Sequence, residues 1–208
     1  MGRLLGPACK LCRREGEKLF LKGARCESNK CALTRKNYAP GIHGGKGSFG
    51  QKSEYTKQLR EKQKAKRIFG IGERQFHNYY KTAETKPGVT GDVFLQILEL
   101  RIDNATYKAG FATSRKHARE MITHGLLTVN GRKVKTPSYG LKVGSVVEPT
   151  VQGKKSVLFT ELAKKKDSSP KWLKVDFKKP SFEVVSLPDK SDLQQNVEAQ
   201  MIVELYSK

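Results

Sequence analysis

The sequence is short of acidic residues and of long apolar runs. Its 208 residues carry 20 Asp and Glu against 41 Lys and Arg, which leaves a formal net charge of +21 at pH 7. Such a surplus repels itself, so it indicates a polyanionic partner, either nucleic acid or an anionic membrane surface. No run approaches the roughly 18 apolar residues of a membrane-spanning helix. The hydrophobic fraction of 37% still allows a modest core, which argues against wholesale disorder.

The N-terminus lacks the features of a targeting segment. The first residues leave no room for the apolar core of a secretory signal, because Lys10, Arg13 and Arg14 follow almost at once. Gly6 stands where an N-myristoylation motif has Ser or Thr. We therefore expect a soluble, cytoplasmic protein that does not bind membranes.

Cysteine is scarce, and all of it lies near the N-terminus. Cys9, Cys12, Cys26 and Cys31 form a C-x2-C pair, a thirteen-residue gap and a C-x4-C pair. Each pair can direct two thiolates at one ion, which predicts a single structural Zn2+ in a closed site with no open position for catalysis. Disulfides are the alternative, and a reducing cytosol disfavours them.

A glycine-rich run over residues 40–48 superficially resembles a phosphate-binding loop. Pro40 stands where the Walker pattern has its first Gly, and Gly47 stands where it has Ser or Thr. We interpret the run as a flexible linker, or as backbone that lies close to another chain or to an RNA phosphate.

A helix over residues 54–69 is expected to be strongly basic. Ser53 is a suitable N-cap for it, and only Glu54 and Glu61 offset its cations. Because so few acids are near, we expect this helix to contact RNA phosphates rather than solvent alone. The predicted contacts are Lys57, Arg60, Lys62, Lys64, Lys66 and Arg67.

Two more apolar helices are expected next. Phe76, Tyr79, Tyr80 and Ala83 recur at helical spacing, and a further helix begins near Thr90. We interpret the aromatic rings as core rather than as platforms for base stacking. The middle of the chain is therefore predicted to be a helical domain.

A pair of helices is indicated after this domain. The first is expected to end at Gly110, and Thr113 or Ser114 can cap the second, which runs to His124. Arginine and lysine near a helix start can bind phosphate together with the free backbone N–H groups. The predicted phosphate contacts here are Arg115, Lys116 and Arg119.

A hairpin is indicated after the helix pair. Asn130-Gly131 is a strong turn signal between two short strands, and residues 143–147 can add a third strand. Arg132 and Lys133 project from the turn, so the unit presents a basic concavity. Such a surface suits a folded RNA junction better than duplex DNA, because RNA is recognised largely by shape, phosphate and 2′-hydroxyl contacts.

Motifs along most of the chain resemble one protein family. Three motifs resemble the S-four-type RNA-binding domain. They are F-A-x-S-R-x-x-A-R from Phe111, H-G-x-x-x-V-N-G from His124 and P-S-Y from Pro137. Motifs outside this domain are similar to the family of bacterial small-subunit ribosomal protein four, in its zinc-carrying form. They are the G-P-x-C-x-x-C-R-R-E-G opening, L-R-E-K-Q-K from Leu59 and the V-E-L-Y-S-K ending.

The resemblance implies a structural component of the ribosome. A member of this family would bind small-subunit ribosomal RNA first, dock on a multi-helix junction and nucleate assembly of the subunit body. It would contact ribosomal protein five, which affects translational accuracy, lie near the mRNA entrance and in some cases repress its own operon. No small-molecule substrate is expected. The remaining predicted RNA contacts are Arg3, Arg13, Arg14, His124 and Asn130.

We predict an α+β fold in four parts. A zinc-binding lobe over 1–44 precedes a helical domain over 45–98, which the resemblance completes with residues 190–208. The helix-pair-plus-hairpin RNA-binding domain spans 99–160, and strands within 161–189 complete a small, mostly antiparallel sheet.

The last third of the chain is expected to hold one more helix and two strands. The helix is predicted over residues 156–166, and the strands over 172–177 and 182–187, where apolar and polar residues alternate. Trp172 is interpreted as core, and Asn196 can cap a terminal helix.

Two rival functions are weighed against this one. RNA pseudouridine synthases carry the same RNA-binding module, and Arg101-Ile102-Asp103 resembles the surroundings of their catalytic Asp. The triplet lies inside the binding module, however, and the chain has no recognisable nucleophile–base constellation. We therefore predict that the protein is not an enzyme and that Asp103 is an exposed partner of Lys or Arg. A DNA-binding zinc protein would need a reading helix, whereas the cations here are spread over every segment.

Overall fold

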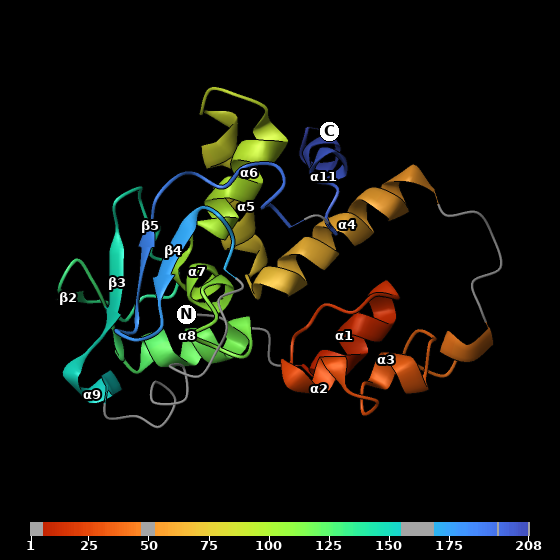
Figure 1. The fold of residues 1–208 in the computed structure, drawn as a ribbon. Coiled ribbons are helices and arrows are strands. Elements are labelled where there is room, and N and C mark those ends of the chain that lie inside the picture. Colours follow the sequence, from red (N-terminus) through yellow and green to blue (C-terminus); the bar gives the residue numbers. More distant parts are fainter. Residues whose placement is uncertain (1–5, 47–52, 155–168, 195, 208) are drawn as a thin grey trace. The chain divides into compact units, whose positions relative to one another are not determined.

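The fold was derived from a computed structural model (Figure 1). The structure describes residues 6–46, 53–154, 169–194 and 196–207. The chain forms two compact units, of which unit 1 comprises Met1–Phe94 with Asn196–Lys208, and unit 2 comprises Leu95–Gln195. Of the helices in the described residues, none combines the length and apolar character needed to cross a membrane. Arg3 and the helix predicted over 156–166 lie outside the described residues.

Unit 1 begins with a lobe of short helices. They are α1 (Ala8–Glu15), α2 (Ala24–Glu27) and α3 (Ala32–Arg35), followed by a 3-10 turn, η1 (Gly44–Lys46). Among the described residues of the lobe, the buried apolar side chains are Leu19 and three cysteines. A core of that size contributes little to stability by itself.

The other described helices of unit 1 are α4 (Glu54–Phe69), α5 (Glu73–Glu84), α6 (Thr90–Glu99) and α11 (Ala199–Tyr206). Helix α6 crosses the unit boundary. Ser53 caps α4 as predicted, because its hydroxyl accepts a hydrogen bond from the Thr56 N–H at 3.3 Å. Helix α11 packs against α4 and crosses it at a steep angle (Figure 1). The prediction that Asn196 caps this helix is wrong, since Glu198 is the N-cap residue and makes no side-chain cap bond.

Aromatic rings pack together in unit 1. Phe76 meets Phe94 edge-on with 4.9 Å between ring centroids, and Tyr80 lies 4.8 Å from Tyr206. Phe76 and Phe94 are fully buried. The interpretation of the aromatic residues of α5 as core is confirmed for Phe76 and Tyr80, whereas Tyr79 is only partly buried.

The helices of unit 2 are α7 (Ile102–Lys108), α8 (Arg115–Thr123) and the short α9 (Val151–Lys154). Ser114 caps α8 by accepting a hydrogen bond from the His117 N–H at 3.2 Å. Helix α7 ends at Lys108, before the predicted Gly110, because Gly110 adopts a left-handed conformation with φ of 78° and closes the turn.

A five-stranded antiparallel sheet completes unit 2, in the order β2-β1-β3-β5-β4. Its strands are β1 (Leu127–Val129), β2 (Arg132–Lys133), β3 (Val146–Pro149), β4 (Leu173–Asp176) and β5 (Ser181–Val184). Strand β3 starts later than predicted because Gly144, with φ of 81°, turns the chain just before it. Ile102, Met121 and Ile122 share one core with strand residues such as Val147. Trp172 belongs to this core, as predicted.

The cations of α4 are held by carboxylates from other elements of unit 1. Glu73, at the start of α5, pairs with Lys62 and Lys66 at 2.8 Å each and accepts a hydrogen bond from the Tyr206 hydroxyl at 2.9 Å. Burial raises the pKa of Glu73, but the hydrogen bonds from Lys62, Lys66 and Tyr206 outweigh it and lower the pKa to about 2. Glu73 thereby joins α4, α5 and α11.

Glu15 of α1 is a second such carboxylate. It is 3% exposed and pairs with Arg67 and, at 3.7 Å, with Arg60. Lys64 pairs with Glu17 at 3.6 Å. The expectation that few acids offset the cations of α4 is therefore wrong, because Glu15, Glu17 and Glu73 lie outside that helix and reach its cations only when unit 1 folds.

We predict that acid weakens unit 1 through Glu73. Its folded pKa of about 2 lies below its ordinary value of 4.5, so its contribution is present above pH 4.5 and is lost as the pH falls toward 2. E73Q should reduce the free energy of unfolding at pH 7 by about 1 kcal/mol, the upper end for a partly exposed ion pair. Urea unfolding followed by circular dichroism at several pH values measures both effects.

The matched control is E54Q. The Glu54 side chain is 71% exposed and pairs with Lys57 within α4, so it joins no second helix. It should unfold like the unchanged chain. An E73Q variant that keeps the full acid dependence between pH 4.5 and 2 would contradict the role given to Glu73.

Candidate nucleic-acid interface

The four cysteines of the N-terminal lobe line one small cavity. Cys9 and Cys12 lie on α1, Cys26 lies on α2, and Cys31 is the N-cap residue of α3. The cavity has a volume of about 20 Å³ and is lined by all four of them. None of the four is in a disulfide. The local fold therefore brings the two predicted pairs to the same place.

The environments of the thiols differ. Burial raises the pKa of Cys12, and the other three cysteines raise it further. Burial also raises the pKa of Cys31, but hydrogen bonds from the backbone of Leu33 and Thr34 outweigh it, so this pKa lies below its ordinary value. The Lys22 N–H donates to Cys26 Sγ at 3.4 Å. Backbone donors that stabilise sulfur charge are thus already in place.

In residue type the four cysteines are the donor set of a four-sulfur zinc site, and they line one cavity. Within the described part of the chain, no group of three or more His, Cys, Asp or Glu side chains is arranged to hold a metal ion. The zinc ion stays a prediction.

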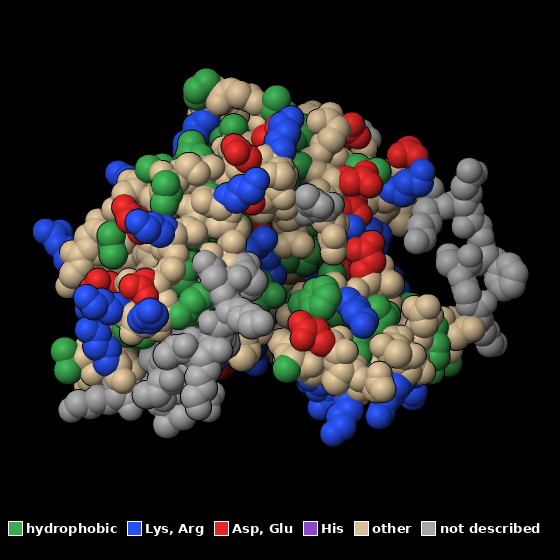
Figure 2. All heavy atoms as spheres, in the orientation of Figure 1, with side chains coloured by type: hydrophobic (Ala, Val, Ile, Leu, Met, Phe, Trp, Pro, Cys, Tyr) green, Lys and Arg blue, Asp and Glu red, His purple; other side chains and the backbone are tan. Residues whose placement is uncertain are grey.

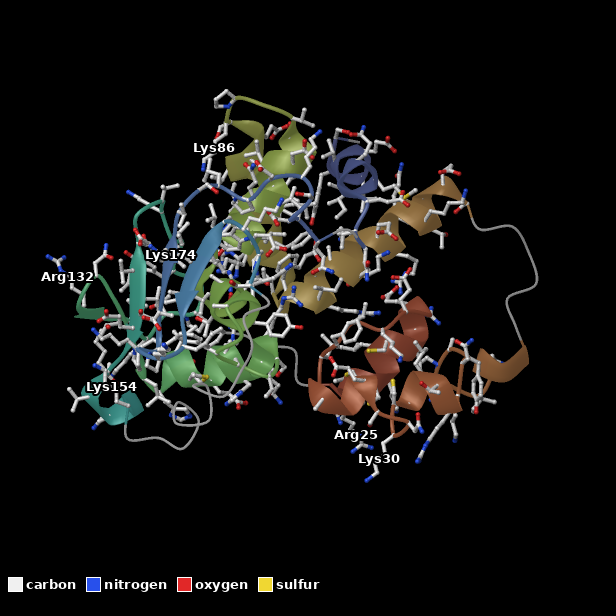
Figure 3. The ribbon with its side chains drawn as sticks, viewed as in Figure 1. Arg25, Lys30, Lys86, Arg132, Lys154 and Lys174 are labelled. Carbon is white, nitrogen blue, oxygen red and sulfur yellow. The ribbon has the colours of Figure 1, made fainter. Side chains whose placement is uncertain are left out.

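Outward-facing cations surround the sulfur cavity. Arg25 and Lys30 project away from the ribbon in Figure 3, and Lys and Arg side chains gather over the same lobe in Figure 2. The exposed cations described in the lobe are Lys10, Arg14, Lys18, Lys22, Arg25, Lys30, Arg35 and Lys36, and none of them forms an ion pair with a described residue. They are free to bind phosphate.

Arg13 differs from these cations. Its guanidinium donates to the backbone oxygens of Tyr38 at 2.9 Å and Ala39 at 3.3 Å, and it lies 4.6 Å from the centroid of the Tyr38 ring. Arg13 therefore fastens the loop after α3 to α1, although it was predicted as an RNA contact.

The cations at the start of α8 are also engaged within the protein. Arg115 Nε donates to Asn104 Oδ1 at 2.7 Å, its Nη2 donates to Gln194 Oε1 at 2.9 Å, and its guanidinium lies 4.7 Å from the Tyr107 ring centroid. Arg119 is 14% exposed, and its Nη1 lies 3.7 Å from Asp103 Oδ2. Of the three predicted phosphate contacts on α8, Lys116 is the exposed one.

Asp103 was expected to be exposed, and it is buried. It is 3% exposed and receives two hydrogen bonds from the guanidinium of Arg101, from Nε at 3.0 Å and from Nη2 at 2.6 Å. The Asn104 N–H donates to the same carboxylate at 2.9 Å. The prediction of a basic partner is right, and the prediction of exposure is wrong because α7 turns its first residues into the core. A carboxylate occupied in this way supports the helix junction.

The tip of the hairpin carries a basic concavity in unit 2. Asn130 and Gly131 both have positive φ, at 48° and 78°, as the tightest hairpin turns require. Asn130 Oδ1 accepts a hydrogen bond from the Val146 N–H at 2.8 Å, which fixes the turn to β3. The concavity has a volume of about 620 Å³, and its lining residues are Val129, Asn130, Arg132, Lys133, Val134, Lys135, Thr136 and Tyr139.

The charge of this concavity is of one sign. Arg132, Lys133 and Lys135 are exposed, and no acidic residue is part of the lining. Arg132 projects outward from β2 in Figure 3. His124 is exposed at the end of α8. Sequence reasoning found Arg132 and Lys133 from the turn signal but missed Lys135, which follows β2 and lies in no motif.

Known proteins match the whole chain. Residues 3–99 match the family model "Ribosomal protein S4/S9 N-terminal domain", and residues 100–147 match "S4 domain". A "Small ribosomal subunit protein uS4" from Halothermothrix orenii is 49% identical over 210 residues, and a "Small ribosomal subunit protein uS4A" from Clostridium acetobutylicum is 48% identical over 208 residues. Each alignment covers all of both chains.

The chain belongs to the uS4 family. The predicted family and the predicted S4 domain are confirmed, while the zinc-carrying form stays a prediction. The S4 domain match begins at residue 100, between the end of α6 at Glu99 and the start of α7. Arg101 is the N-cap residue of α7. Its first strand-like contact is the bridge between Arg101 and Gly140.

We predict that Arg115 contributes to the stability of the S4 domain. R115A leaves Asn104 and Gln194 without a charged donor, so it should reduce the free energy of unfolding by about 2 kcal/mol. K116A, the exposed neighbour on α8, should change it by less than about 0.5 kcal/mol. Urea unfolding compares the two variants, and equal stability of R115A and K116A would contradict this role.

Proposed function

We propose that this chain is a structural component of the small ribosomal subunit and binds ribosomal RNA through exposed cations of both units. The observation that carries the proposal is the hairpin concavity, which is lined by three exposed cations and by no acid. The unpaired cations around the sulfur cavity support a second RNA-facing surface. The family adds weight, because its full-length relatives are named as small-subunit ribosomal proteins.

This function is not enzymatic. The full-length relatives are named as ribosomal proteins rather than as enzymes. The carboxylate that suggested a pseudouridine synthase, Asp103, is occupied by Arg101 and by the Asn104 N–H. Ribosomal RNA is the ligand, and the chain acts by binding it.

The finer proposal is that the protein docks early on a multi-helix RNA junction and nucleates assembly of the subunit body. Cations on two separate units support it, because a junction presents phosphates in several directions to a shape-reading protein. A contact with ribosomal protein five that affects accuracy, a place near the mRNA entrance and repression of its own operon rest on the family resemblance.

We test the RNA surface by the salt dependence of binding. Each lost phosphate contact should reduce the slope of the logarithm of the binding constant against the logarithm of the salt concentration by about one. The double variant R132A/K133A should therefore reduce this slope by about two and weaken binding to a small-subunit rRNA fragment. K57A removes a cation that pairs with Glu54 at 2.7 Å and should leave the slope unchanged. If the two variants behave alike, the proposed surface is wrong.

We further propose that Cys9, Cys12, Cys26 and Cys31 hold one structural Zn2+. Four thiols that line one cavity support this, as does a lobe whose described apolar core is otherwise Leu19. Zinc would supply the stability that such a small core lacks. The lobe presents many exposed cations, so holding it together would also hold that RNA surface in shape.

Metal content gives the test. Native protein should contain one zinc per chain, and a chelator should remove helical signal and weaken rRNA binding. C26S should lose the zinc and show the same defects without chelator, whereas S28A, a change at an exposed residue in the same segment, should keep the zinc. Metal-free protein with full helical signal, or protein with two disulfides, would contradict the proposal.

A further inference from the structure

The lining of the hairpin concavity includes one aromatic ring. Tyr139 lines the concavity, and its side chain is 45% exposed. Within the described residues this side chain makes no hydrogen bond and no ring contact. An exposed aromatic ring without a partner is common on a protein surface, but here it stands beside cations.

The backbone that carries this ring is held firmly. The Tyr139 carbonyl accepts a hydrogen bond from the Ile102 N–H at 2.9 Å, and the Tyr139 N–H donates to the Thr136 carbonyl at 3.1 Å. On the next residues, Gly140 bridges to Arg101, and the Leu141 N–H donates to the Leu100 carbonyl at 2.8 Å. The ring is therefore displayed from a segment that is tied to the start of α7, so little ordering is needed when a ligand packs on it.

The side chains of two of the lysines run close to Gly125, just after α8. An added Cβ at Gly125 would lie 2.4 Å from Lys133 Cε and 3.4 Å from Lys135 Cε, so the stems of both lysines cross that glycine. Arg132 belongs to β2, whose turn is fixed by Asn130. The ring and the three cations thus line the same concavity.

We propose that this concavity binds an unpaired nucleotide of the ribosomal RNA, with its base stacked on Tyr139 and its flanking phosphates on Arg132, Lys133 and Lys135. The inference rests on the proposed function and specifies its ligand. An aromatic face stacks on any base, and Lys and Arg bind the backbone on either side. A base inside a duplex has no free face to offer, so the site selects a nucleotide from a loop, bulge or junction.

The test uses the full-length chain and fluorescence anisotropy with an eight-nucleotide single-stranded RNA of mixed sequence. Y139L should weaken binding by about 5-fold to 150-fold, the range for losing one base–aromatic stack, while Y139F keeps the ring and should bind within about twofold of the unchanged chain. An RNA backbone of equal length with abasic sites carries the same charge and should bind all three proteins equally. Thermal unfolding checks that Y139L is folded.

The outcomes separate this inference from the proposed function. If Y139L binds the oligonucleotide as well as Y139F does, or weakens the abasic RNA by the same factor, stacking on Tyr139 is overturned. A small-subunit rRNA fragment is titrated in parallel. If the unchanged chain fails to bind that fragment while the oligonucleotide results hold, the proposed function is overturned and the stacking site stands.

Discussion

Three carboxylates, each shared by two cations, hold the helices of this strongly basic chain. Glu15 pairs with two arginines of α4, Glu73 pairs with two lysines of α4, and Asp103 pairs with Arg101 and Arg119. With a net charge of +21, each helix would otherwise bring like charges together. Removing Glu15 or Asp103 leaves two largely buried cations side by side, which costs more than the pairs themselves contribute. Glu73 is 46% exposed, so its removal costs less.

This pairing divides the cations into two groups. Most cations of α4, together with Arg115 and Arg119 of α8, bind partners on other elements, whereas Lys116 is exposed. Apart from Arg13, the described cations of the N-terminal lobe and those of the hairpin face outward without an acidic partner in the described residues. RNA binding therefore depends on the second group, while the first gives it a rigid support. A chain that used all its cations for RNA would lose the ion pairs that join α4 to α1 and α5.

Local signals predicted much of this fold, and non-local contacts did not. The cap at Ser53, the turn at Asn130-Gly131 and the core role of Phe76 follow from neighbours within a few residues, and all three are confirmed. The partners of Lys62 and Arg67 could not be read this way, because Glu73 and Glu15 reach them only when helices pack. Asp103 looked exposed for the same reason.

In the candidate site, too, local signals were predicted from the sequence and non-local contacts were not. The spacing of the four cysteines indicated that they converge, and the hairpin signal indicated a basic tip. Tyr139 was visible only as a member of a short motif, since neither its exposure nor its place beside Lys135 follows from periodicity. Arg115 was expected to bind phosphate because it starts a helix, and its bonds to Asn104 and Gln194 depend on segments far along the chain.

The most direct measurement of the central claim is lysine acetylation, quantified by mass spectrometry, on the free protein and on its complex with a small-subunit rRNA fragment. We expect Lys30, Lys133 and Lys135 to react readily in the free protein and to be protected by RNA. Lys62 and Lys66 should react slowly in both states, because Glu73 holds them. Fast reaction of Lys62 and Lys66 in the free protein, followed by protection in the complex, would contradict it.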